Sequence, residues 1–240
     1  ARWERGVPLR LRIGSGQLSA AEELAVLSGS NAMAIGDGSA DNWEILQFAG
    51  AVLVAPSTYE ISLRLRGQLG TDGIMPVEWP AGSTIVLLDT ALTQVNLPQS
   101  ARGLVRYYRV GGATRGYDGP GVVPYSGAFQ GIGLRPYSVC HLRGQGGLGQ
   151  DIALSWVRRT RIDGDSWLST EVPLGEESEN YRVQVLTGIT LHREVIATSP
   201  VWTYTAAMQA ADGVTPGSRI EVAQLSASYG AGPVRQLALG

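Results

Sequence analysis

The stretch Gly144-Gln-Gly-Gly-Leu-Gly-Gln-Asp-Ile-Ala-Leu-Ser-Trp156 decides between two kinds of fold. Its first six residues match the Gly-x-Gly-x-x-Gly string, which binds a dinucleotide only when a helix begins directly after the glycines. Here Ile152, Leu154 and Trp156 alternate with small or polar residues, which is typical of a half-buried strand. The glycines therefore predict a hairpin or a strand-connecting loop, and the stretch favours a β fold over a nucleotide site.

The same alternation recurs along most of the chain, with Gly, Pro, Asn and Asp between the apolar runs. It predicts strands over residues 9–13, 61–66, 84–88, 104–110, 181–185, 202–204 and 220–222. One segment differs, because Ser19-Ala-Ala-Glu22 matches a capping box and good helix formers follow it. We therefore expect a mainly β protein with one or two short helices between residues 19 and 36.

Glycine and proline crowd the middle of the chain, between Gly111 and Gly133. This composition is typical of a linker, or of a long surface loop within one domain. We expect a β-rich domain over residues 1–110, a Gly/Pro-rich linker or long loop over 111–135, and a small β-sandwich over 136–240. In the sandwich, the alternating pattern places Trp156 and Trp202 in the core.

Composition excludes several classes of protein. The net charge of −2 gives no basic surplus for nucleic acid or an anionic membrane, and no run of 18 apolar residues could span a bilayer. Cys140 is the only cysteine, and we expect it to be buried and structural. Because the chain starts at Ala1 without an initiator Met, we expect it to be a piece of a longer polypeptide.

Candidate binding residues fall into three groups. Arg158, Arg159 and Arg161 precede an acidic loop with Glu171, Glu176, Glu177 and Glu179; they form either a solvated hairpin edge or a protein contact. Trp79 and Trp167 lie in turn-rich segments, where they either pack locally or stack on a sugar. Asp163 and Asp165 start like a calcium loop that lacks its later ligands, which indicates a turn or a weak calcium site. No catalytic motif is present, so we assign no catalytic residue, cofactor or metal ligand and expect no enzymatic activity.

Several longer segments resemble one known family. They are Leu63-Arg-Leu-Arg-Gly-Gln-Leu-Gly-Thr-Asp72, Trp79-Pro-Ala-Gly-Ser-Thr-Ile-Val-Leu-Leu-Asp89, Leu134–Arg143, Ile152–Arg161, Pro173–Arg182 and Ala206–Asp212. Together they resemble the C-terminal part of the host-specificity, or baseplate megatron, proteins of gene transfer agents, which are related to phage tail-tip proteins. The resemblance covers nearly the whole chain.

This resemblance implies a fibronectin-III-like sandwich in which Trp156 matches the strand-B tryptophan and Tyr181-x-Val183-x-Val185 matches strand C. It also implies a structural protein of the tail tip or baseplate of a virion-like particle. Such proteins form homotrimers, contact the hub, the distal tail protein and fibres, and meet the host envelope. The resemblance assigns no catalytic residue to this chain. The alternative function is a carbohydrate-binding module for cell-surface glycans, with Trp79 and Trp167 as contact residues.

Overall fold

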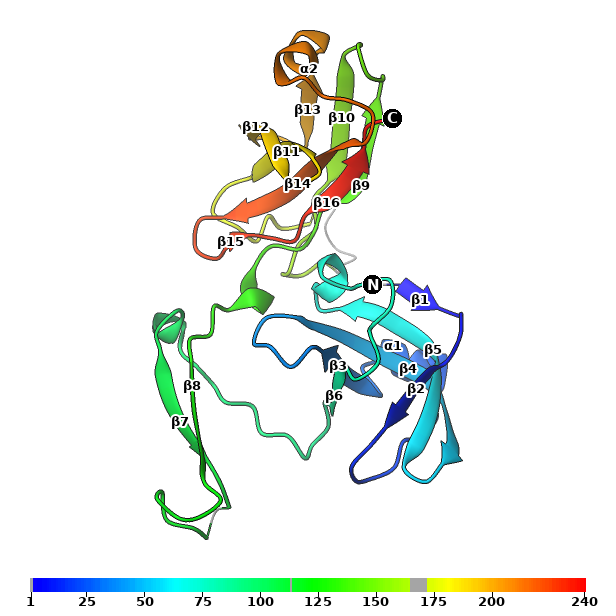
Figure 1. The fold of residues 1–240 in the computed structure, drawn as a ribbon, viewed down its shortest axis with the longest axis vertical. Coiled ribbons are helices and arrows are strands. Elements are labelled where there is room, and N and C mark those ends of the chain that lie inside the picture. The colour runs from blue at the N-terminus through cyan, green and yellow to red at the C-terminus, as the bar shows by residue number, and fades with distance from the viewer. Residues whose placement is uncertain (1, 113, 165–171) are drawn as a thin grey trace.

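The structure, a computed structural model, describes residues 2–112, 114–164 and 172–240. Figure 1 shows three parts: an N-terminal sheet in blue and cyan, a two-stranded arm in green, and a C-terminal pair of sheets in yellow-green to red. Every strand pairing is antiparallel. The chain is mainly β, as the alternating pattern predicts.

The N-terminal sheet has six strands in the order β1-β5-β4-β3-β6, with β2 also paired to β5. Their bounds are β1 Arg2–Glu4, β2 Leu9–Arg12, β3 Ala32–Gly36, β4 Trp43–Ala55, β5 Thr58–Gln68 and β6 Thr84–Leu87. Alternate residues of these strands share one face, and their apolar side chains form a buried cluster that includes Met33, Leu46, Phe48 and Ile61. The expected strands at 9–13, 61–66 and 84–88 are confirmed.

The helical expectation for residues 19–36 is only partly right. One short helix, α1 Glu23–Leu27, is present, and a 3-10 turn, η1 Thr71–Gly73, follows β5. Glu22 stands at the helix start in an extended conformation with no side-chain cap, so the capping box is wrong. The amide of Ala21 instead donates to the carbonyl of Ala49 on β4, which holds this segment extended.

The Gly/Pro-rich segment contains regular structure. Strands β7 Arg106–Val110 and β8 Val123–Gly127 form a two-stranded hairpin, flanked by the 3-10 turns η2 Gln99–Ala101 and η3 Ile132–Leu134. We call residues 106–127 the arm. In Figure 1 the arm stands apart from both the N-terminal sheet and the C-terminal sheets.

The C-terminal part is a fibronectin-III-like sandwich, as expected. One sheet has the order β13-β10-β9, and the other has β12-β11-β14 with β15 and β16 paired to β14. The bounds are β9 Cys140–Gln145, β10 Ile152–Val157, β11 Asn180–Thr187, β12 Thr190–Ala197, β13 Val201–Tyr204, β14 Ser218–Ser226, β15 Gly230–Ala231 and β16 Arg235–Ala238. Gly144 lies in β9, and Gly146, Gly147 and Gly149 lie in the turn between β9 and β10, which confirms the prediction of a hairpin for this stretch.

The core of the sandwich lies between these two sheets. Trp156 is buried and packs edge-on against Tyr181, with 5.2 Å between ring centroids. Trp202 is only half-buried and stacks on Tyr204, so its placement in the core is partly right. Cys140 is half-buried rather than buried, and its thiol donates to the carbonyl of Val157.

A second helix, α2 Ala206–Asp212, follows β13 and has no counterpart among the sequence-based predictions. The Thr205 hydroxyl accepts a hydrogen bond from the amide of Met208, which satisfies one of the free donors at the helix start. Gly213 ends the helix with φ +63°. Neither described helix is long and apolar enough to cross a bilayer.

Candidate interaction surface

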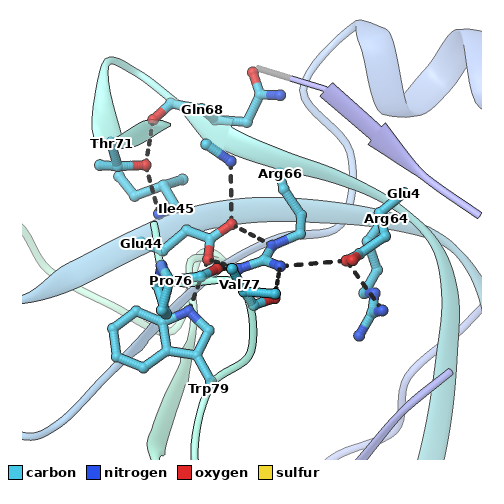
Figure 2. Close-up of polar contacts among 11 residues, drawn as sticks. Glu4, Glu44, Ile45, Arg64, Arg66, Gln68, Thr71, Pro76, Val77 and Trp79 are labelled. Carbon is cyan, nitrogen blue, oxygen red and sulfur yellow. Dashed lines mark hydrogen bonds and ion pairs between the residues drawn. The ribbon is translucent and has the colours of Figure 1, made fainter. Parts of the chain in front are cut away.

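Trp79, one of the predicted glycan contacts, is part of a polar network within the N-terminal sheet. Its indole N–H donates to Glu44 Oε2 over 2.7 Å, and the half-buried ring packs against the apolar cluster of the sheet. Figure 2 shows that Glu44 lies between the Trp79 indole and the Arg66 guanidinium. The indole N–H of Trp79 is therefore already bonded within the chain.

Arg66 is the centre of that network. All five of its N–H groups have acceptors: both carboxylate oxygens of Glu44, one oxygen of Glu4, and the carbonyls of Pro76 and Val77. The bonds to Glu44 raise the pKa of Arg66 above its ordinary value. Because Glu44 and Arg66 have side chains 0% and 5% exposed, removing either one would leave the other buried without its main partner.

The three arginines of the sandwich contact two different parts of the chain, the acidic loop and the N-terminal sheet region. Arg158 donates to the carbonyls of Val172 and Pro173, and Arg161 pairs with Glu176 at 2.7 Å. Arg159 pairs with Asp72 of the N-terminal sheet region at 2.7 Å. The geometry thus assigns intramolecular contacts to residues that the sequence offered as partner contacts.

Arg159 belongs to a seam between the N-terminal sheet region and the sandwich. Its guanidinium also lies over the ring of Tyr137, 5.0 Å from the centroid. At Gly73, a Cβ atom would overlap Pro233, and at Gly70 a Cβ atom would overlap Tyr137. Glycine at these two positions lets the side chains of Tyr137 and Pro233 pack directly against the backbone, so the two parts are in close contact there.

The acidic loop that follows the arginines is also engaged within the sandwich. Glu177 accepts hydrogen bonds from the amides of Ala227 and Ser228 and from the Ser228 hydroxyl. The bond from the Ser228 hydroxyl is the largest of the causes that lower the pKa of Glu177 to about 2. Glu179 accepts from the hydroxyl of Tyr181.

Some candidate residues lie outside the described part of the chain. These are Trp167, Asp165 and Glu171. Asp163 is described and stands in a turn with φ +46°. The described residues hold no group of three or more His, Cys, Asp or Glu side chains that could bind a metal ion.

The arm exposes several apolar side chains on a regular element of the described chain. Its register pairs Tyr108 with Tyr125 and Val110 with Val123, so these four side chains share one face. Val110, Val123 and Tyr125 are 64%, 62% and 47% exposed. Among the described helices and strands, β7 and β8 make extensive contacts only with each other. We call these four residues the apolar face of the arm.

Among the described elements, no third strand or helix packs extensively against the two-stranded arm. An isolated two-stranded hairpin is at best marginally stable in water, and an apolar face gains stability only when it is covered. The arm contains four tyrosines and three arginines, which are residue types enriched at binding hot spots. The arm has three arginines against one aspartate, so it is positive while the whole chain is negative.

The sequence reasoning missed the arm as an interaction surface. It found the strand Leu104–Val110 but interpreted residues 111–135 as a linker or a long loop. The available signal was Val122-Val-Pro-Tyr125, a short β-branched and aromatic run after the glycines, which repeats the character of Arg106-Tyr-Tyr-Arg109. Two such runs around a Gly-rich turn are typical of a hairpin.

These features define a mainly β protein with an exposed, positively charged arm. The model of a family described as "Rcc01698-like, C-terminal" matches residues 1–86, which hold most of the N-terminal sheet. This is a gene-transfer-agent-related family name, and the N-terminal part of the chain is similar to that family. No curated protein matches the chain.

Among solved structures, the chain is similar to domains d3–d4 of the extracellular region of rat CD45. The two sequences are 9% identical, the match covers 79% of this chain and 93% of that chain, and the TM-score is 0.30. At this score the similarity carries no argument about function.

Proposed function

We propose that this chain is a structural component of the tail tip or baseplate of a gene transfer agent, a phage-like particle. The single observation that carries the proposal is the arm, on whose apolar face Val110, Val123 and Tyr125 are exposed in the isolated chain. A subunit of an assembly is expected to expose such a face until its neighbour covers it. The match of residues 1–86 to a gene-transfer-agent-related family supports the same assignment.

In this proposal the sheets act as rigid supports and the arm makes the contact. The partners are other baseplate subunits, namely the hub, the distal tail protein, fibres, or further copies of this chain in a homotrimer. The buried network around Arg66 and the seam at Arg159 keep the supporting parts fixed. A rigid support limits the entropy lost on assembly. The chain has no catalytic role in this proposal.

The test is to label purified particles with a gold-conjugated antibody against this chain and to image them. Gold at the tail tip is the expected result. Gold on the head or along the tail tube, or particles without the chain, would overturn the proposal. An antibody against a head protein provides the control for the position of the label.

A further inference from the structure

A hollow at the distal end of the arm is unrelated to its apolar face. It has a volume of about 320 Å³ and is lined by Arg109, Arg115, Tyr117, Val122 and the backbone of the loop glycines Gly111, Gly112 and Gly116. This volume lies within the range of small-ligand sites, which is about 300–1,000 Å³. We propose that this hollow binds an acidic sugar, a uronic-acid unit of a cell-surface glycan, through its carboxylate.

The two guanidinium groups are held in place by the loop itself. Arg109 Nη1 donates to the carbonyl of Tyr117 over 2.8 Å, and Arg115 Nη1 donates to the carbonyl of Pro120 over 2.7 Å. Within the described residues, both arginines bond to protein through Nη1 alone. Each therefore keeps further N–H donors, and a guanidinium binds a carboxylate best through two parallel donors.

In the chain without a ligand, Asp118 neutralises part of the positive charge of the hollow. Its carboxylate contacts Arg109 Nη1 at 2.5 Å, but its side chain is 89% exposed and that of Arg109 is 51% exposed. Exposed ion pairs of this kind contribute little to stability, so a ligand carboxylate can compete for the arginine. Asp118 thus acts as a weak internal competitor.

Tyr117 supplies the apolar part of a sugar site. It is 79% exposed and lies in the hollow beside the arginines. An exposed aromatic ring offers a flat apolar face to the C–H groups of a sugar ring, while the guanidinium groups bind the acid. The combination favours a carboxylated sugar over a neutral one, and it differs from the site predicted at Trp79 and Trp167.

This inference rests on the proposed function, because a baseplate protein is a component that meets the cell envelope. It deepens that function by naming the ligand class. The two can fail separately, since antibody labelling reports the position in the particle and sugar titration reports the hollow. Gold at the tail tip without sugar binding would remove this inference alone.

The experiment is isothermal titration calorimetry of the chain with tetragalacturonate. Its fully methyl-esterified form is the neutral matched probe. We expect binding of the acid form that weakens with added salt, and no detectable binding of the ester. Arg115→Gln and Arg109→Gln should each weaken binding about tenfold or more, since each removes a charged hydrogen-bond donor. Arg10→Gln, at an exposed position of β2, should leave binding unchanged.

Asp118→Asn keeps the inference falsifiable if an arginine variant misfolds. Removing the internal competitor should strengthen binding of tetragalacturonate, and a misfolded protein could not produce that result. Equal binding of the acid and the ester, no binding of the acid, or unchanged affinity in both arginine variants would overturn the inference. Tighter binding of a single-stranded DNA tetranucleotide than of tetragalacturonate would also overturn it, in favour of phosphate recognition.

Discussion

The ion pair of Glu44 and Arg66 links two strands of the N-terminal sheet. Their side chains join β4 and β5, and Glu44 also accepts from the indole of Trp79 and the amide of Gly67. Replacing Glu44 by Gln leaves the buried guanidinium of Arg66 without its main counter-charge. We expect a loss of about 3–5 kcal/mol in the free energy of unfolding.

Urea denaturation followed by tryptophan fluorescence measures this change. The matched control is Glu60→Gln, which removes an ion pair with the exposed Arg10 and should cost less than about 1 kcal/mol. Equal losses in the two variants would contradict the central role of the Glu44–Arg66 pair.

Glu177 gives the sandwich a pH dependence. Hydrogen bonds from Ser228 lower the pKa of this carboxylate from 4.5 to about 2 in the folded chain. A depressed pKa stabilises the fold above the unfolded value, and this stabilisation is lost as the pH falls from about 4.5 to about 2. We expect Glu177→Gln to flatten the decline in stability over this window.

Thermal unfolding at a series of pH values between 2 and 6 measures the effect. Glu194→Gln, on the edge strand β12, is the control that should keep the slope of the parent chain. A slope unchanged by Glu177→Gln would contradict the prediction.

At the scale of elements, a substitution on the apolar face of the arm should impair assembly without changing the stability of the chain. Because Val123 is 62% exposed, Val123→Ser should change the stability of the isolated chain by less than about 0.5 kcal/mol. In the proposed assembly the same residue becomes buried, so the variant should be depleted from purified particles. Quantitative immunoblotting of particles relative to total cell protein measures the depletion.

Ile189→Ser provides the matched control for that experiment. Ile189 is 99% exposed in the turn between β11 and β12, far along the chain from the arm. Its replacement should leave incorporation unchanged. Equal incorporation of both variants would show that the apolar face is not an assembly contact.

Some strands could be predicted from the sequence and others could not. Alternation located strands such as Ile152–Val157 because one face of each lies on a core, which is a local signal. Residues 32–36 were expected within a helical region but form β3, because pairing with β4 and β6 on both sides outweighs local propensity. The strand β8 was hidden because it contains Pro124 and depends on its partner β7.

The candidate site was harder to predict than the fold for the same physical reason. Arg159 looked available for a partner because the sequence places it beside other arginines, yet its guanidinium reaches Asp72, 87 residues away along the chain. Only the tertiary fold brings such groups together. Conversely, the exposed face of the arm follows from which strands lack neighbours, and no local pattern encodes that.

At the scale of the whole molecule, the seam fixes the sandwich relative to the N-terminal sheet. Arg159 binds Asp72 and Tyr137 there, and Gly73 packs against Pro233 with no room for a Cβ atom. Gly73→Val should push the two parts apart without disturbing either core. We expect faster cleavage of the chain near residues 129–136 by a protease and a larger radius of gyration in small-angle X-ray scattering.

Gly147→Val is the control for this last prediction, because a Cβ atom at Gly147 meets nothing within 4 Å. It should leave the radius of gyration and the cleavage rate unchanged. An unchanged radius in Gly73→Val, with both variants folded by circular dichroism, would mean that the seam does not set the arrangement. A larger radius of gyration in Gly73→Val alone would establish that the close contact at Pro233 fixes the sandwich relative to the N-terminal sheet.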